Sequence, residues 1–278
     1  MSTVKITPEQ LKETLSTQFV NCDKALNTIY KYMTLSRVLE ILENKTHQIG
    51  FVSPENWNDP YEIKFLNTDY TVLNGYKQPK IYCFCVRMDN INEEASWKIY
   101  KKENEPLLRM TIKTNSFLSS LKDFAQKYEC NIYFSKVDYR LSSKEINTLH
   151  LPKNPYYHEF FDDFDDMQYV KLMSLKRRAF SYENEYRIFM IPKNHKAVES
   201  LIINNILFVP IDLKMISRFT INPEDKLDET LSSQINHEKY LAECKFIKKR
   251  IRSSYPEVEV YISGLYSKVK NVEKIENA

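Results

Sequence analysis

The chain has 278 residues, of which 42% are hydrophobic and 28% charged, and its formal net charge is +3. This is the composition of a globular protein with a buried core, and so small a basic excess does not by itself indicate a nucleic-acid-binding protein. The three glycines, Gly50, Gly75 and Gly264, stand alone, which excludes both the G-x-G-x-x-G dinucleotide loop and the Walker phosphate loop.

The chain carries no sign of export or of a membrane span. It has no run of about 18 apolar residues, the length that a transmembrane helix requires. Its first 19 residues are polar and lack the apolar core of a signal peptide. The five cysteines are odd in number and scattered, which is typical of reduced thiols. We therefore predict a cytoplasmic protein without a membrane partner.

Hydrophobic periodicity and capping residues predict an alternation of helices and strands. In chain order we expect a helix over 8–18, a strand over 29–33, a helix over 35–44 capped by Thr34, a strand over 49–53, a loop over 54–60, a strand over 80–86 and a helix over 93–102. There follow a strand over 107–113, a helix over 115–128, a strand over 131–139, a loop over 140–156, a long helix over 156–178, strands over 182–191, 206–211 and 216–221, a helix over 226–254, a strand over 258–263 and a frayed tail from about 268.

These elements do not follow a steady β-α-β rhythm. Such an order favours an α+β fold with a mainly antiparallel sheet over a doubly wound parallel sheet. No internal repeat and no linker rich in Pro, Gly or Ser interrupts the chain. We therefore predict a single domain over 1–278, with its core at about 28–265.

The segment Ser181-Tyr-Glu-Asn-Glu-Tyr-Arg187 is the leading candidate for chemistry. On a strand, alternate side chains share a face, so Ser181, Glu183, Glu185 and Arg187 are expected on one side. Two carboxylates beside an arginine can adjust each other's pKa values at a reacting centre. The competing interpretation is an exposed strand face carrying a plain ion pair.

Four other segments carry weaker signals. Trp57-Asn-Asp-Pro-Tyr-Glu62 predicts a rigid turn in which Asp59 bonds nearby backbone amides. Cys83 and Cys85 share a strand face but fall short of the four ligands of a zinc site, so we expect no metal. The acidic run Asp162, Asp163, Asp165 and Asp166 beside His158 fits the dipole of a helix that ends in Lys176-Arg-Arg178. The basic stretch from Lys245 to Arg252 can contact phosphates, or form a solvated helix face.

Taken in order, short motifs of this chain resemble a large bacterial family of domains of unknown function. The motifs are Tyr30-Lys-Tyr-Met, Phe51-Val-Ser-Pro, Trp57-Asn-Asp-Pro-Tyr-Glu62, Tyr82-Cys-Phe-Cys, Ser96-Trp97-x-x-Tyr100 and Tyr182-Glu-x-Glu-Tyr-Arg187. That family in turn looks like a remote relative of the ADP-ribosyltransferase fold. The likeness rests on the order of the motifs across about 28–265 and is an analogy at the level of the fold.

The resemblance implies a set of roles. Tyr30 or Tyr32 would contact the ribose or nicotinamide of NAD, and Ser53 would support the pocket. Glu185 would be the catalytic carboxylate and Glu183 would assist the acceptor. Arg187, or Lys31, would meet the pyrophosphate of NAD. An ionised carboxylate on the ribose would stabilise the oxocarbenium-like state through which the nicotinamide bond breaks.

The function expected from this resemblance is NAD-dependent transfer of ADP-ribose to an intracellular macromolecule. The acceptor would be protein, RNA or DNA, and the setting a toxin or phage-defence system with a neutralising antitoxin protein. The first alternative is a non-catalytic binding module in which Glu183, Glu185 and Arg187 form a structural ion-pair ladder. The second is a metal-dependent nuclease that uses the residues from Asp162 to Asp166.

Overall fold

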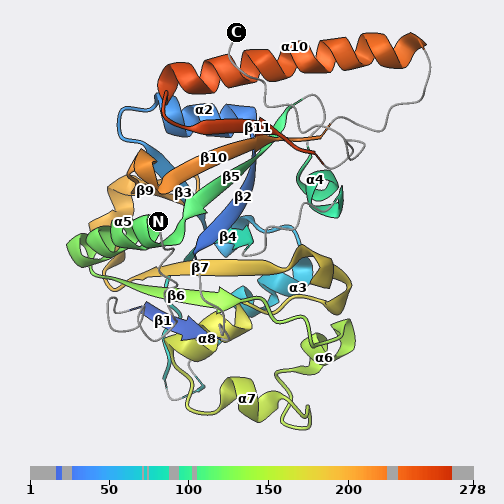
Figure 1. Cartoon of the computed structure of the whole chain (residues 1–278). Helices are drawn as coiled ribbons and strands as arrows, with labels where there is room; N and C mark the ends of the chain where they lie inside the picture. Colours follow the sequence, from blue (N-terminus) through green and yellow to red (C-terminus); the bar gives the residue numbers. More distant parts are fainter. Residues whose placement is uncertain are drawn as a thin grey trace. The chain divides into compact units, whose positions relative to one another are not determined.

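The computed structural model describes residues 17–20, 27–70, 72–73, 75–87, 94–101, 105–223 and 231–264. The chain separates into two compact units that interleave along the sequence. Unit 1 comprises Met1–Asn27, Gln48–Met88 and Leu118–Pro210, and unit 2 comprises Thr28–His47, Asp89–Phe117 and Ile211–Ala278. Each unit contains strands of a mostly antiparallel sheet and the helices that pack on them (Figure 1).

The sheet of unit 1 is centred on a strand that is buried along its whole length. Its strands lie in the order β1 (Thr17–Val20), β6 (Cys130–Lys136), β7 (Glu185–Pro192) and β4 (Tyr82–Arg87); β3 (Gln48–Val52) pairs with β4 and with β9 (Ile206–Pro210), which also pairs with β8 (Ile202–Ile203). Only β1 and β6 are parallel among these pairs. Every residue of β7 is buried, so its two charged side chains need partners inside the protein.

Short helices and an aromatic core complete unit 1. The helical segments are η1 (Pro54–Asn56), α3 (Pro60–Ile63), η2 (Lys64–Asn67), α6 (Ser143–Thr148), α7 (Tyr157–Phe161), α8 (Asp166–Leu172), η3 (Arg178–Glu183), α9 (His195–Val198) and η4 (Glu199–Leu201). Tyr70 stacks on Phe164 with ring centroids 4.8 Å apart and meets Tyr169 edge-on. The Tyr70 hydroxyl donates to the carbonyl of Phe65, so the polar atom of this buried ring is satisfied.

Unit 2 holds a sheet whose two faces differ in character. Its strands run in the order β2 (Thr28–Thr34), β5 (Leu107–Lys113), β10 (Ile216–Ile221) and β11 (Glu259–Ile262), and only β10 and β11 are parallel. Its helices are α2 (Leu35–Glu43), α4 (Glu94–Tyr100), α10 (Leu231–Ser254) and the 3-10 turn η5 (Leu213–Met215). The boundary between the units falls within α5 (Thr114–Tyr128).

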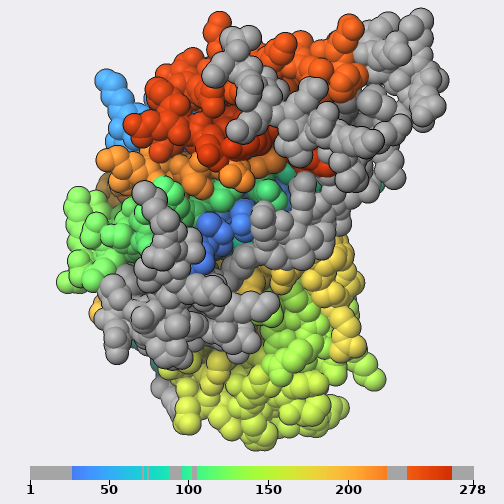
Figure 2. Space-filling view, viewed as in Figure 1, coloured from blue at the N-terminus to red at the C-terminus, as the bar shows by residue number. Residues whose placement is uncertain are grey.

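Strand register assigns the side chains of unit 2 to faces. Ile29 lies opposite Ile112, and Phe219 opposite Met110, so one face is apolar apart from Lys31, which also lies opposite Met110. The amphipathic helix α2 lies beside α10 in Figure 1, and their residues are in contact. The space-filling view in Figure 2 shows α10, coloured orange to red, at the surface of unit 2. Most basic side chains of its stretch from Lys245 to Arg252 are exposed, as expected of a solvated helix face.

The predicted α+β fold with a mainly antiparallel sheet is confirmed. The strands predicted from 29 to 139 and from 206 to 263 are present with shifts of a few residues at their ends. Two strands, β1 and β8, were not predicted. The predicted helix over 8–18 and the frayed tail from about 268 fall largely outside the described residues, and residues 17 and 18 belong to β1. Among the described helices none is both long and apolar enough to span a membrane.

The prediction of one long helix over 156–178 is wrong. The segment forms α7 and α8, separated by Asp163, whose φ is 48°. Asp165 then begins α8 by accepting from the backbone N–H of Gln168, because an aspartate at this position satisfies an orphan amide. The predicted loop over 140–156 was also wrong in part, since Ser142 and Glu145 form a capping box that begins α6.

Candidate functional site

The turn that begins at Asp59 carries a glutamate into the interior of unit 1. Asp59 caps α3: one carboxylate oxygen accepts from the backbone N–H of Tyr61 at 2.9 Å, which confirms the predicted turn. The other oxygen accepts from the Arg177 guanidinium at 2.9 Å. Glu62, in the first turn of α3, is buried. A glutamate so placed requires cationic partners.

Arg187 supplies one of these cations from the middle of the buried strand β7. Its side chain is only 1% exposed. Its Nη2 lies 2.5 Å from a Glu62 oxygen, its Nε lies 3.0 Å from a Glu185 oxygen, and its Nη1 donates to the carbonyl of Met173 at 2.6 Å. The guanidinium carbon lies 4.2 Å from the ring centroid of Trp57. The predicted pyrophosphate contact of Arg187 would compete with all of these interactions.

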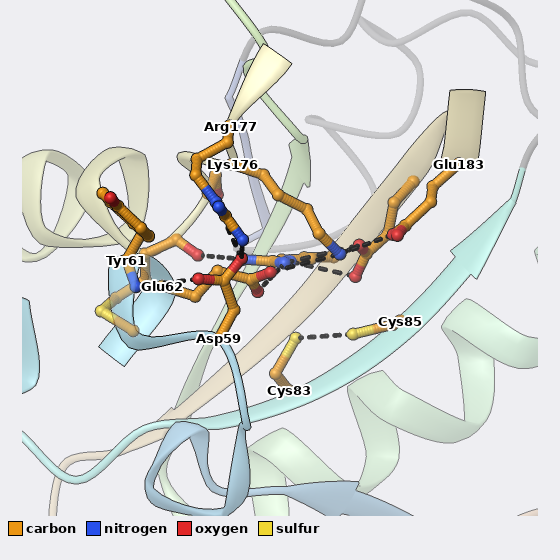
Figure 3. Close-up of polar contacts among 12 residues, drawn as sticks. Asp59, Tyr61, Glu62, Cys83, Cys85, Lys176, Arg177 and Glu183 are labelled. Carbon is orange, nitrogen blue, oxygen red and sulfur yellow. Dashed lines mark hydrogen bonds and ion pairs between the residues drawn. The ribbon is translucent and has the colours of Figure 1, made fainter. Parts of the chain in front are cut away.

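Lys176 is the second cation and joins three carboxylates. Its Nζ lies 2.5 Å from Glu183, 3.2 Å from Glu185 and 3.2 Å from Glu62. Figure 3 shows its side chain reaching from the segment after α8 toward Glu183. The backbone N–H of Lys176 donates to the carbonyl of Asp138 at 3.0 Å, which fixes the start of this side chain beside the sheet.

We call Glu62, Lys176, Glu183, Glu185 and Arg187 the ion cluster. It contains three carboxylates and two cations, so with all groups ionised it carries one surplus negative charge. A buried group of unequal charges costs more to desolvate than a balanced pair. The surplus therefore has to be relieved by a change in proton affinity at one of the carboxyls.

The pKa values of Glu183 and Glu185, the two glutamates near the start of β7, are shifted in opposite directions. Burial by itself would raise the pKa of Glu185, but Arg187 and Lys176 outweigh it and hold the pKa of that carboxyl well below its usual range. Burial raises the pKa of Glu183, and Lys176 offsets this only in part. One carboxylate is thus held ionised while its neighbour binds a proton more readily, which is the pattern of an acid–base pair.

The expectation that Ser181, Glu183, Glu185 and Arg187 share a strand face is wrong for the first two. The strand begins at Glu185, and Glu183 ends the 3-10 helix η3. Asn184 between them has a φ of 42°, in the left-handed region that asparagine tolerates better than most residues. The carboxylates of Glu183 and Glu185 still meet, because Lys176 contacts both.

Asn184 offers a local test of this turn. We expect Asn184→Ala to lower the free energy of unfolding by about 1 kcal/mol, because a Cβ without a local hydrogen-bonding group is strained at positive φ. Asn184→Gly should lower the free energy of unfolding much less, since glycine adopts this conformation freely. Urea unfolding at pH 7 compares the two variants. Equal losses in both would mean that the side chain, and not the backbone conformation, matters here.

Two thiols border the ion cluster on β4. The Sγ atoms of Cys83 and Cys85 are 3.7 Å apart (Figure 3). Burial, together with a hydrogen bond to Cys85, raises the pKa of the Cys83 thiol well above its ordinary value. Within the described residues no group of three or more His, Cys, Asp or Glu side chains is arranged to hold a metal ion. The acidic run instead serves helix ends: Asp162 follows α7 and Asp165 caps α8.

The remaining predicted residues have clear local contacts. Ser53, in unit 1, caps η1 by accepting from the backbone N–H of Glu55. In unit 2, the hydroxyls of Tyr30 and Thr28 are 3.0 Å apart. Tyr32 stacks on Tyr100 at 5.4 Å and meets Trp97 edge-on. Their predicted roles toward NAD stay predictions.

Sequence reasoning missed Glu62 and Lys176 as members of the cluster. Glu62 lay in a motif that was singled out as a rigid turn and as part of the resemblance, and Lys176 was assigned to the end of a helix. Glu62 is far in sequence from Lys176 and from β7, and Lys176, although only nine residues before Glu185, lies outside the strand pattern that was used to find the site. A buried strand with two charged residues was the one available signal, since it demands partners from elsewhere in the chain.

Comparison of the chain with protein-family models, curated proteins and solved structures gave no match in any of the three. The resemblance to a bacterial family of unknown function, and through it to ADP-ribosyltransferases, therefore stays a prediction.

Proposed function

We propose that the protein transfers ADP-ribose from NAD to an intracellular macromolecule, with Glu185 and Glu183 as the carboxylates that act. The observation that supports this most is their unequal state: Glu185 is held ionised by Arg187 and Lys176, and Glu183 has a raised pKa. Chemistry that passes through an oxocarbenium-like state needs one carboxylate that stays charged and a second that exchanges a proton.

In the proposed reaction the bond between nicotinamide and ribose breaks, and nicotinamide leaves with the bonding electron pair. Glu185 accepts a hydrogen bond from the ribose 2′-hydroxyl and stabilises the positive charge that develops on the sugar. Glu183 takes the proton of the acceptor group as that group bonds to the ribose carbon. Lys176, which contacts both carboxylates, holds them in position.

The acceptor class follows from a weaker observation. The basic side chains of α10 are mostly exposed from Lys245 to Arg252, and such a stretch favours phosphate-bearing acceptors such as RNA or DNA. The proposal includes the setting expected from the resemblance, a cytoplasmic toxin or phage-defence effector restrained by an antitoxin protein.

The test is nicotinamide release and label transfer from labelled NAD in a cell extract. We expect wild type to release nicotinamide, and Glu185→Gln to do so at least about 100-fold more slowly, the usual loss for one electrostatic group at a reacting centre. Glu159→Gln is the matched control, because Glu159 pairs with the exposed Arg140 and should keep full activity. The acceptor is identified by the fraction, protein or nucleic acid, that carries the label.

Because Glu185 also supports the fold, each variant is first checked by circular dichroism and assayed well below its unfolding temperature. Full activity of folded Glu185→Gln, or no nicotinamide release by folded wild type in an extract, would refute the proposed chemistry.

A second candidate is the non-catalytic binding module. It is favoured by the burial of Glu185, since one carboxylate oxygen is paired with Arg187 and the other with Lys176. This reading predicts that Glu185→Gln lowers stability and that wild type cleaves no NAD. The acidic run supports no nuclease proposal, because Asp162 and Asp165 serve as helix caps.

A further inference from the structure

Arg109, on β5 of unit 2, is a buried cation without a matching anion. Arg109 is only 7% exposed. Its Nε and Nη1 atoms are buried and have no hydrogen-bond partner, and no ion pair joins it to any described residue. Its guanidinium carbon lies 5.2 Å from the ring centroid of Tyr30. Burying such a charge unpaired costs several kcal/mol, so this placement requires an explanation.

The strand register shows what surrounds Arg109. It lies opposite Tyr32 on β2 and opposite Thr220 on β10. Tyr30 and Thr111 are the next pair on the same face. This face, opposite the apolar one, therefore gathers aromatic rings, hydroxyls and a guanidinium, beside the buried Leu107 that packs with Tyr32.

The acidic group nearest in register is already engaged. Among the described residues on this face of β2, β5, β10 and β11, Glu259 is the sole carboxylate. It lies opposite Arg218 and accepts from that guanidinium at 2.9 Å. Arg218 also covers the ring of Tyr261 at 4.7 Å. The two arginines of the face thus differ: Arg218 is paired and about half exposed, whereas Arg109 is buried with free donors.

We infer that Arg109 is the anion-binding residue of a ligand site on this face, and that the ligand is a small molecule with a phosphate group. A guanidinium presents N–H donors in a planar fork that matches phosphate oxygens. The neighbouring Tyr30 and Tyr32 offer rings and hydroxyls of the kind that line small-molecule sites. The inference does not use Glu185, so its test is separate from the test of the proposed chemistry.

The site is tested by calorimetry with two probes, ADP and inorganic phosphate, on the full chain. We expect wild type to bind ADP, and Arg109→Gln to bind it about 10- to 100-fold more weakly, the effect of losing hydrogen bonds from a charged donor. Arg218→Gln is the matched control and should keep wild-type affinity. Tighter binding of ADP than of phosphate would identify a nucleotide ligand, and equal binding would identify the phosphate alone.

A second measurement uses stability without ligand. If Arg109 awaits an anion, Arg109→Gln should unfold at the same or a higher temperature than wild type in phosphate-free buffer. Added ADP should then raise the unfolding temperature of wild type and of Arg218→Gln, but not that of Arg109→Gln.

Three results would overturn the inference: no binding of either probe by wild type, equal binding by Arg109→Gln, or a lower unfolding temperature of Arg109→Gln without ligand. The last would show that the guanidinium already has a partner within the protein. Nicotinamide release by Glu185→Gln is measured separately, so failure of the proposed chemistry and failure of this site are distinguishable.

Discussion

Replacing Arg187 with methionine should lower the free energy of unfolding by about 3–5 kcal/mol at pH 7, the usual cost of removing one partner from a buried ion pair. Methionine fills much of the same space, so the loss is electrostatic more than steric. Glu62 and Glu185 would each lose a hydrogen-bonded cation, and the surplus negative charge of the ion cluster would rise from one to two. The measurement is urea unfolding followed by tryptophan fluorescence and circular dichroism.

Arg250→Met is the matched control for this prediction. Arg250 pairs with Glu43, but both side chains are about half exposed, and an exposed pair contributes about 0–1 kcal/mol. The contrast between the two arginines isolates burial as the cause. A loss in Arg187→Met no larger than that in Arg250→Met would mean that water reaches the cluster and that its charges are screened.

Much of the sheet could be predicted because strands leave local traces. The segments 107–113 and 216–221 were predicted with the bounds that the structure has for β5 and β10, since their β-branched and apolar residues alternate or run together between turn signals. Thr34 was predicted as the cap of α2 and does stand at its N-cap position, but its side chain makes no capping hydrogen bond. In each case the decisive information lies within about ten residues.

The long helix over 156–178 failed for the converse reason. Its apolar residues have helical spacing, but Asp163 adopts a positive φ and Asp165 starts a new helix. The aromatic residues of this segment, Tyr169 among them, pack into the core with Tyr70, and that packing outweighs local propensity. The sequence order of charges, acidic first and basic last, was consistent with one helix and with two.

The candidate site could be predicted only in part. Glu183, Glu185 and Arg187 were named from their local pattern, and Glu185 and Arg187 do share one face of β7. Lys176, which contacts both Glu183 and Glu185, was not predicted as part of the site. Its position depends on the bridge between Asp138 and Leu175. Contacts between segments so far apart in sequence are set by tertiary packing, which periodicity does not encode.

The two glutamates of the cluster should respond to pH in opposite ways. The pKa of Glu185 is lowered in the folded protein, so its ionisation stabilises the fold above about pH 4.3, the ordinary glutamate value. That contribution is lost as the pH falls below this value toward the folded pKa. We therefore expect Glu185→Gln to cost about 3 kcal/mol at pH 7, at the lower end for a broken buried pair, and progressively less from pH 5 to pH 3.

Glu183 should show the opposite slope because its pKa is raised in the folded protein. Its folded form holds a proton more tightly than the unfolded chain does, so wild type loses stability from this group as the pH rises from the unfolded value near 4.3 through the higher folded pKa. Glu183→Gln does not lose stability in this way, and it also removes the surplus charge of the ion cluster. Its free energy of unfolding, relative to that of wild type, should therefore increase between pH 3 and pH 7. Urea unfolding of both variants at pH 3, 5 and 7 measures the slopes. Parallel slopes in the two variants would contradict the unequal carboxylates on which the proposed chemistry depends.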